Sequence, residues 1–337
     1  MGTLGDREIL GASIYTAESN YNILDDLNNS TLQREFHMLA FTNFAEWKFV
    51  IFNIVLLIYL LSVLGNMIIV ILVCHVSKLQ TPMYFFLCNL SVQDLINVTS
   101  FQPKFLAITI TGDTAITFPH CITQIFIFIM CIDSEFFLLT TMAYDRYVAV
   151  CVPLRYSLIM SKRICLYSAS GCWITGSLNA IRYSFIISFL SFCKSKEINH
   201  FFCEVECILK LSCNNTRNIE RLIFVESFLF GLFPFILVLI SYVCIISTIV
   251  KIRTKAGRLK AFSSCSSHLT VVILLYGTGL SSYMKSGSES SQEQDKLITM
   301  FYIMLVPVLN PLVYSLRNKE VLKAFRILMQ KKTQMEL

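Results

Sequence analysis

Asp145 and Arg146 are the strongest candidates for a functional role in this sequence, because they are adjacent at the end of a long apolar run that begins near Cys121. A charged pair is costly inside a bilayer, so at the edge of a membrane-spanning helix it either snorkels to the interface or operates a switch. Taken alone, Asp145-Arg146-Tyr147 is equally consistent with a simple ion pair at a helix end.

Further carboxylates lie inside apolar runs, where they are costly to bury without a partner or water. Asp133 and Glu135 are two residues apart, so on a helix they point to nearly opposite sides and are not expected to share a site. The residues near Asp133 toward the outside are Phe128, Ile129 and Ile132. We expect Asp133 to face a ligand cavity there and Glu226 to border the same cavity. The alternative for each acid is a bond to a polar neighbour on an adjacent helix.

A cation site is predicted deeper in the membrane. Asp94 lies near the middle of one apolar run, and Glu135 lies about three helical turns from Arg146. Together with Asn66 and Asn310 they could hold a hydrated cation such as sodium, since carboxylate and amide oxygens suit a hard cation. The alternative is a protonated, hydrogen-bonded carboxyl group, because burial disfavours the charged form.

Apolar runs are the elements that must position these side chains. The chain has 337 residues, of which 55% are apolar and 15% charged, against about 25% charged in soluble proteins. The runs occupy residues 49–74, 83–111, 121–144, 164–191, 219–250, 265–284 and 297–316. Each can cross roughly 30 Å of hydrocarbon as a helix, which favours an all-α membrane protein, a seven-transmembrane helix bundle, over a β-barrel. Kinks are expected at Pro103, Pro234, Pro307 and Pro311.

The distribution of Lys and Arg predicts the orientation. These residues gather in segments 75–82, 145–163, 251–262 and 317–337. By the positive-inside rule, these segments are cytoplasmic. The expected parts are an extracellular tail over residues 1–48, the helical domain over 49–316 and a cytoplasmic tail over 317–337. Overlapping glycosylation sequons begin at Asn28 and Asn29 in the extracellular tail.

The 13 cysteines fall into two groups. Eight lie in or beside apolar runs, where a free thiol acts as a small hydrophobe. The other five lie on the predicted outer side and are Cys121, Cys193, Cys203, Cys207 and Cys213. That side should be oxidising, and five cysteines cannot all pair with one another.

The usual signatures of enzymes and nucleic-acid binding are missing from the sequence. It contains no HExxH, GxSxG or Walker loop, and its histidines lack ligand spacing for a metal. The basic segment 251–260 is interpreted as an interface anchor and partner-docking surface rather than a nucleic-acid contact. We therefore expect no enzyme, no nucleic-acid partner and no cofactor other than the sodium ion.

Longer motifs follow one another along the chain. They are Leu64-Gly65-Asn66, Pro82-Met-Tyr-Phe-Phe-Leu87, Met142-Ala-Tyr-Asp-Arg-Tyr-Val-Ala-Val-Cys151, Pro153-Leu-Arg-Tyr156, Ser241-Tyr242, Lys260-Ala-Phe-Ser-Ser-Cys-Ser-Ser-His268 and Asn310-Pro-Leu-Val-Tyr-Ser-Leu-Arg-Asn-Lys-Glu320. In this order they resemble the motifs of olfactory (odorant) receptors, a branch of the rhodopsin-like (class A) G-protein-coupled receptors. The resemblance runs from about Asn29 to Phe325.

The resemblance implies a function. Such a receptor binds small volatile or apolar odorants and activates a heterotrimeric G protein of the olfactory stimulatory type, which raises cyclic AMP. It lies in the lipid bilayer of the plasma membrane, with its N-terminus outside, in the cilia of olfactory sensory neurons. A short cytoplasmic helix is expected after the seventh span.

The resemblance also assigns roles to residues. It implies disulfides Cys121–Cys203 and Cys193–Cys213, with Cys207 left over. The cytoplasmic switch would comprise Asp145, Arg146, Tyr242 and Tyr314, with Arg146 paired to Asp145 at rest. The ligand cavity would be lined by Phe128, Ile129, Ile132, Asp133, Glu226, Phe230, Tyr276, Gly279, Leu280, Tyr283, Met300 and Ile303.

Asp133 and Glu226 depart from the family, which is often neutral at these positions. We hypothesise that the two acids favour amine-bearing or hydrogen-bonding odorants; an unchanged odorant ranking after Asp133→Asn and Glu226→Gln would discard this idea. Two other functions fit the sequence less closely. One is a rhodopsin-like receptor for a non-odorant small molecule, lipid or peptide. The other is an ion-coupled transporter, for which the chain lacks an internal repeat.

Overall fold

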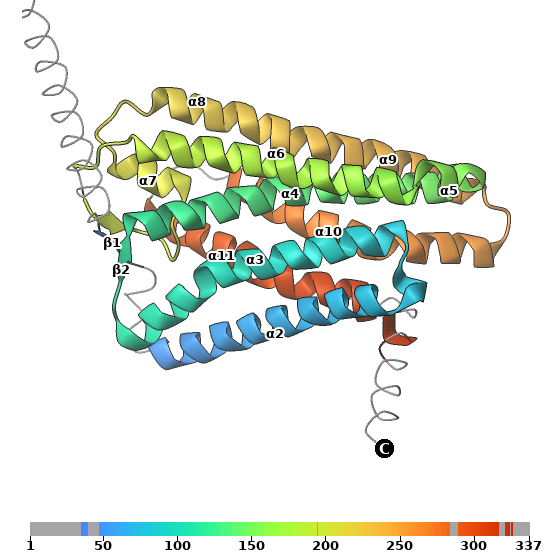
Figure 1. Ribbon diagram of the computed structural model, residues 1–337, viewed down its shortest axis with the longest axis horizontal. Coiled ribbons are helices and arrows are strands. Elements are labelled where there is room, and N and C mark those ends of the chain that lie inside the picture. The colour runs from blue at the N-terminus through green and yellow to red at the C-terminus, as the bar shows by residue number, and fades with distance from the viewer. Residues whose placement is uncertain are drawn as a thin grey trace, which may run out of the picture.

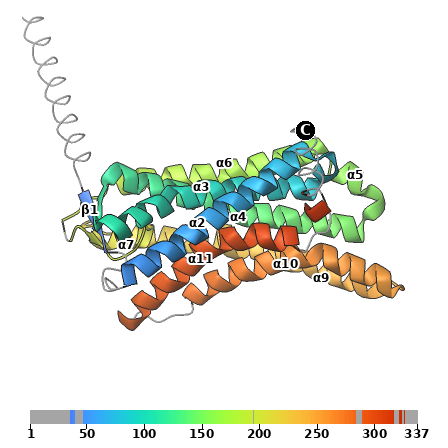
Figure 2. The ribbon, with the colours of Figure 1, turned by 90° about the horizontal axis from the view of Figure 1, so that it is seen from below.

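Long helices run side by side along the molecule in the computed structural model (Figures 1 and 2). The structure describes residues 35–39, 47–193, 195–283, 289–316, 321–323 and 325. The long helices are α2 (Lys48–His75), α3 (Pro82–Thr111), α4 (Phe118–Cys151), α6 (Lys162–Ser188), α8 (Arg217–Glu226) continued by the π-helical turn η4 (Ser227–Leu232) and α9 (Phe233–Lys251), α10 (Lys255–Tyr283) and α11 (Glu289–Leu316). With α8 to α9 taken as one rod, the helices correspond in order to the seven predicted runs.

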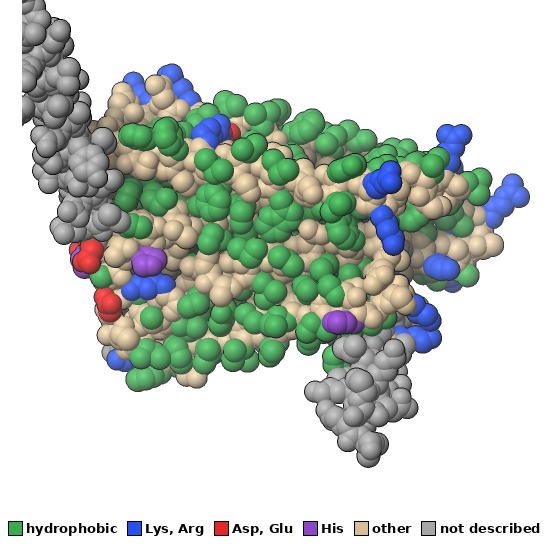
Figure 3. Space-filling model, viewed as in Figure 1, with side chains coloured by type: hydrophobic (Ala, Val, Ile, Leu, Met, Phe, Trp, Pro, Cys, Tyr) green, Lys and Arg blue, Asp and Glu red, His purple; other side chains and the backbone are tan. Residues whose placement is uncertain are grey.

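Short elements close the two ends of the bundle (Figure 1). One end, which we call the basic end, holds η2 (Ser77–Leu79), η3 (Pro153–Arg155) and α5 (Tyr156–Ile159). The other end, which we call the cap end, holds β1 (Glu35–Met38), β2 (Ala115–Thr117), β3 (Glu197–Ile198) and α7 (Val205–Leu211). The ends differ in charge, because Lys and Arg side chains gather at the basic end (Figure 3).

The outer surface of the bundle is apolar along most of its length (Figure 3). Leu57, Leu178 and Val243 are each more than half exposed. Large apolar surfaces of this kind are rare on soluble monomers and suit contact with lipid. By length and composition, three stretches among the described residues qualify as membrane spans, namely α2, α4 and Arg217–Lys251. The two parts of α10, which meet at 42°, make a fourth when they are taken as one span.

Helix ends and interruptions follow from particular residues. Proline begins α3 at Pro82, where a missing N–H costs nothing. The same helix ends at Gly112, whose φ of 72° is a left-handed conformation that favours glycine. The fifth rod is interrupted by η4, which ends at Leu232, and Pro234 in the first turn of α9 lacks the N–H that would bond to the carbonyl of the preceding turn. The break expected at Pro234 is therefore a π-helical turn.

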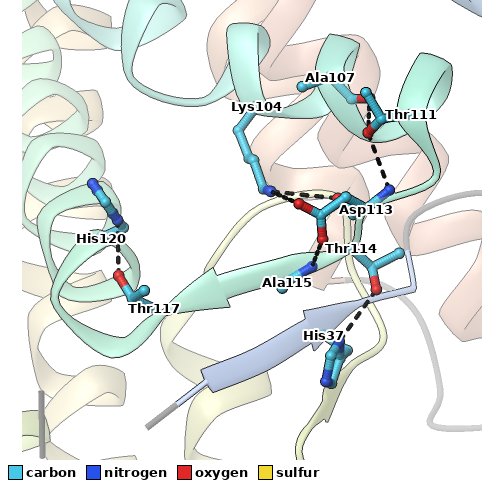
Figure 4. Close-up of polar contacts among 9 residues, drawn as sticks. All are labelled: His37, Lys104, Ala107, Thr111, Asp113, Thr114, Ala115, Thr117 and His120. Carbon is cyan, nitrogen blue, oxygen red and sulfur yellow. Dashed lines mark hydrogen bonds and ion pairs between the residues drawn. The ribbon is translucent and has the colours of Figure 1, made fainter. Parts of the chain in front are cut away.

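The cap end contains a three-stranded sheet that the sequence analysis did not predict. Its strand order is β2-β1-β3, with β1 antiparallel to β2 and parallel to β3. Phe36 and Met38 of β1 are buried, whereas Glu35 and His37 are exposed, as expected for a strand with one covered face. The ring of His37 lies 3.3 Å from the hydroxyl of Thr114 beside β2 (Figure 4). The sheet thus joins part of the N-terminal tail to two loops distant in sequence.

Candidate functional site

Asp145 and Arg146 lie near the end of α4, at the basic end of the bundle. Arg146 donates from Nε to Oδ2 of Asp145 at 3.0 Å, and the two side chains form an ion pair. The hydroxyl of Tyr156 on α5 donates to Oδ1 of Asp145 at 2.7 Å. Burial and then the nearby Asp145 charge raise the pKa of Tyr156, so the phenol remains a donor. Both oxygens of Asp145 therefore have partners, and Arg146 is held in the pairing expected at rest.

His268 on α10 joins two other helices. One ring nitrogen, Nδ1, lies 2.8 Å from the hydroxyl oxygen of Tyr242 on α9, and the other, Nε2, lies 3.0 Å from the carbonyl oxygen of Leu139 on α4. The Tyr242 hydroxyl also lies 3.2 Å from the carbonyl oxygen of Cys265. Tyr314, the other predicted switch tyrosine, is 1% exposed on α11. The sequence does not predict this role of His268, because no short spacing links it to Tyr242 or Leu139.

Asp94, Asn66 and Asn310, three residues of the predicted cation site, are all buried. Asn310 donates from Nδ2 to Oδ2 of Asp94 at 3.0 Å. Asn66 donates from Nδ2 to the carbonyl oxygens of Ser62 and Pro307 at 3.0 and 2.8 Å. The Oδ1 atoms of Asn66 and Asn310 are buried and have no donor among the described residues. One carboxylate and two spare amide oxygens fit a hard cation such as sodium. Glu135 is also buried, on α4.

Aromatic and aliphatic side chains occupy most of the predicted ligand-cavity positions. Phe128 packs against Phe202 with ring centroids 5.2 Å apart, and Phe230 packs against Phe137 at 5.6 Å. Tyr276 lies between the rings of Phe136 and Phe235. Ile129 and Ile303 are buried in the cap-side core, against which Met300 packs, and Ile132 is half-buried. The side chains at positions 279, 280 and 283 lie outside the described part of the chain.

Asp133 and Glu226 both have partners on α6. Asn179 donates from Nδ2 to Oδ2 of Asp133 at 2.7 Å. Arg182 forms an ion pair with Glu226 and donates to Oδ1 of Asn179. This is the alternative in which each acid bonds to a polar neighbour on an adjacent helix. Neither Arg182 nor Asn179 is among the predicted site residues, although an arginine within an apolar run is a signal of a polar partner nearby.

Two disulfides stabilise the cap end, and both match the predicted pairs. Cys121 at the start of α4 bonds to Cys203, with Cα atoms 5.4 Å apart. Cys193 bonds to Cys213, with Cα atoms 5.9 Å apart. Cys207 is a free thiol, as expected. Burial and then the Glu204 charge raise the pKa of Cys207 to about 12, which keeps the thiol protonated.

His200 is a buried titratable group of the cap end. Burial, and then the positive charges of Lys296 and Lys210, lower its pKa to about 3. The imidazole is therefore neutral at pH 7, and its 3.6 Å approach to Glu204 is not an ion pair at that pH. Lys296 on α11 donates to Oδ1 of Asn199 at 2.5 Å, which ties the seventh helix to the same loop.

A shallow hollow lies outside the predicted ligand cavity, on the surface of α8. It is lined by Arg217, Glu220, Arg221, Phe224 and Val225. Its apolar residues are exposed and its charged residues lie within two turns of the start of α8. This arrangement is typical of a helix that enters the lipid headgroup region, where arginine side chains extend toward the polar boundary.

Comparison with known proteins identifies the family to which this helix bundle belongs. A family model described as "Olfactory receptor" matches residues 55–332. The chain belongs to the olfactory receptor family. It is 42% identical to olfactory receptor 5AR1 of Mus musculus over 309 residues, which are 92% of this chain and 100% of that protein. It is 44% identical to olfactory receptor-like protein OLF3 of Canis lupus familiaris over 301 residues, which are 89% of this chain and 95% of that protein.

The tails of this olfactory receptor extend largely beyond the described residues. Asn28 and Asn29, the predicted glycosylation sites, lie outside the described residues. Most of the predicted cytoplasmic tail, 317–337, also lies outside them. Its described part, residues 321–323 and 325, is helical. The family assignment also agrees with the expectation that the protein is not an enzyme.

Proposed function

We propose that this olfactory receptor binds small volatile or apolar odorants in a cavity toward the cap end and activates an olfactory stimulatory G protein, which raises cyclic AMP. The family match is the observation that carries this proposal. It covers residues 55–332 and so includes both the expected cavity positions and the Asp145 and Arg146 pair. Lipid surrounds the bundle, in keeping with its apolar outer surface.

The proposed mechanism is a shift between two states. At rest, Asp145 and Tyr156 hold Arg146 in place through the contacts of the basic end. In the active state, α10 moves outward, Tyr242 and Tyr314 turn toward Arg146, and a helix of the G protein enters the gap. An odorant shifts this equilibrium only as far as its affinities for the two states differ.

The proposed location is the plasma membrane of olfactory sensory neuron cilia, with the cap end outside the cell. The gathering of Lys and Arg at the basic end supports this orientation, because such residues favour the cytoplasmic side. The two disulfides also suit an oxidising exterior. The sequons at Asn28 and Asn29 would then be available for glycosylation.

We further propose a sodium ion beside Asp94, with Asn66 and Asn310 as oxygen ligands and Glu135 on the neighbouring helix. The unpaired Oδ1 atoms of the two asparagines support this assignment. When bound, the ion would supply positive charge that offsets the buried carboxylate. Asp94→Asn should remove any effect of sodium concentration on the signal measured without odorant, and a persistent effect would contradict the assignment.

A screen of volatile compounds tests the proposed function. The full chain is expressed with an olfactory stimulatory G protein and a cyclic AMP reporter, and it is challenged with a chemically diverse odorant library. Arg146→Gln, matched for surface level, serves as the control. We expect odorant responses in the natural chain that disappear in the variant. Responses only to peptides or lipids, or responses that survive the loss of Arg146, would contradict the proposal.

A further inference from the structure

Four polar side chains from three helices form a connected chain near the cap end. Asp133 on α4 accepts from Asn179 on α6, Asn179 accepts from Arg182 one turn further along α6, and Arg182 pairs with Glu226 at the end of α8. We call these four residues the Arg182 chain. One guanidinium is thus linked directly to one carboxylate and, through a single amide, to a second.

The ion pair with Arg182 reduces the negative charge that Glu226 presents to a ligand. Its side chain is only 7% exposed, and one of its carboxylate oxygens contacts Arg182. A guanidinium remains charged under all ordinary conditions, so it cancels most of the field of a contacting carboxylate. An ammonium group that approached Glu226 would meet an ion pair and would have to compete with Arg182. The acid therefore does not act as an isolated negative charge.

Arg182 also stands beside the expected wall of the cavity. Glu226 is the last residue before η4, and this π-helical turn contains Phe230, whose ring packs against Phe137 of α4. The guanidinium lies 5.4 Å from the ring centroid of Tyr183, which helps to fix its position. Arg182 thus anchors the start of the turn that carries a predicted ligand-binding residue.

We propose that Arg182 is a specificity-determining residue of this receptor. It neutralises Glu226, so that this part of the cavity favours uncharged, hydrogen-bonding odorants over amines and carboxylic acids, and through Asn179 it orients Asp133. This inference rests on the proposed function, and it narrows the ligand class expected from the two acids alone. Removing either partner of the ion pair should leave an uncompensated charge that attracts a ligand of the opposite charge.

The test compares ligands that share one carbon skeleton. A neutral odorant found to activate the natural chain is measured with the corresponding amine and carboxylic acid in the cyclic AMP assay. Arg182→Gln should improve the potency of the amine relative to the neutral ligand by about tenfold, and Glu226→Gln should do the same for the acid. The double variant should return to the natural ranking. The inference would be overturned if amines were the most potent ligands of the natural chain. It would also be overturned if the ranking of the three ligands were unchanged in both single variants.

Matched controls separate charge from general damage. Arg221→Gln removes an exposed arginine from α8 and should leave the ranking unchanged. Arg182→Lys retains the positive charge and should keep the preference for neutral ligands. Surface levels are measured for every variant. If Arg221→Gln shifted the ranking as strongly as Arg182→Gln, the effect would not belong to the ion pair.

A second measurement needs no ligand. Thermal unfolding of the purified full chain is compared for Arg182→Gln, Glu226→Gln and the double variant. Each single variant should lower the melting temperature. If the two residues are coupled, the double variant should lower it by less than the sum of the two single effects, with a difference of about 3 °C or more. Additive losses would overturn the inference. If the natural chain reached the cell surface but responded to no odorant, the proposed function would be contradicted instead. The unfolding measurements on the variants would still show whether Arg182 and Glu226 are coupled.

Discussion

Asp145 shares its two oxygens between Arg146 and Tyr156, so its hold on the arginine depends on both. Tyr156→Phe removes one donor to a charged acceptor, and such bonds contribute about 1.5–3 kcal/mol. We expect the variant to release Arg146 more readily and to raise cyclic AMP without odorant by up to about tenfold. The signal is measured at equal surface level beside Tyr167→Phe, which changes an exposed tyrosine of α6. An unchanged basal signal would show that Tyr156 does not restrain the switch.

The buried ring of His200 predicts that the stability of the receptor depends on pH. Its folded pKa of about 3 lies below the ordinary value of 6.5, so the unfolded chain binds a proton first as the pH falls. Stability should therefore be independent of this group above pH 6.5 and should fall between pH 6.5 and about 3, by at most about 1.4 kcal/mol for each pH unit. The ring lies near the charged groups Glu204, Lys210 and Lys296, and their charges also affect how the stability depends on pH.

Melting temperatures of the purified receptor at pH 7.5 and pH 5.5 test this dependence. His200→Gln should lose less stability on acidification than the natural chain, because the titrating ring is gone. His120→Gln changes an exposed histidine of the same end and should behave like the natural chain. Equal losses in all three proteins would rule out His200 as the source.

At the scale of elements, α4 and α6 pack closely because a glycine lies at their contact. A Cβ atom added to Gly176 would lie 2.4 Å from Oγ of Ser134 and 2.6 Å from the carbonyl oxygen of Met130. The backbone oxygen cannot move without shifting α4, so Gly176→Ala should destabilise the receptor by about 1–3 kcal/mol. Gly171→Ala, on the same helix, meets nothing within 4 Å. Thermal unfolding of the two variants should separate them clearly, and equal melting temperatures would contradict close packing here.

Elements differed in how far the sequence predicted them. The first span was predicted at 49–74 and is α2, Lys48–His75, because a long apolar run leaves few alternatives in lipid. The cap sheet was missed, since β1 has four residues and its partners lie far away in the sequence. The same reason explains why Arg182 and His268 were overlooked. Their roles depend on which helices become neighbours, and a single sequence does not report that.

For the whole molecule, the proposed topology puts the cap end and the basic end on opposite sides of a membrane. The proposed seven crossings would place the N-terminus outside and the C-terminus inside the cell. An epitope attached at the N-terminus should be accessible to antibody on intact cells, and one at the C-terminus only after permeabilisation. Both epitopes on one side would require an even number of crossings and would contradict the proposed topology.

In the proposed mechanism, an odorant bound toward the cap end changes the state of Arg146 at the basic end. The most direct measurement is nucleotide exchange by the stimulatory G protein, with the purified full chain in lipid nanodiscs and an odorant identified by the screen. The odorant should speed exchange several-fold with the natural chain and should have no effect with Arg146→Gln. Exchange that the odorant does not accelerate, or that it accelerates equally in both proteins, would contradict this mechanism.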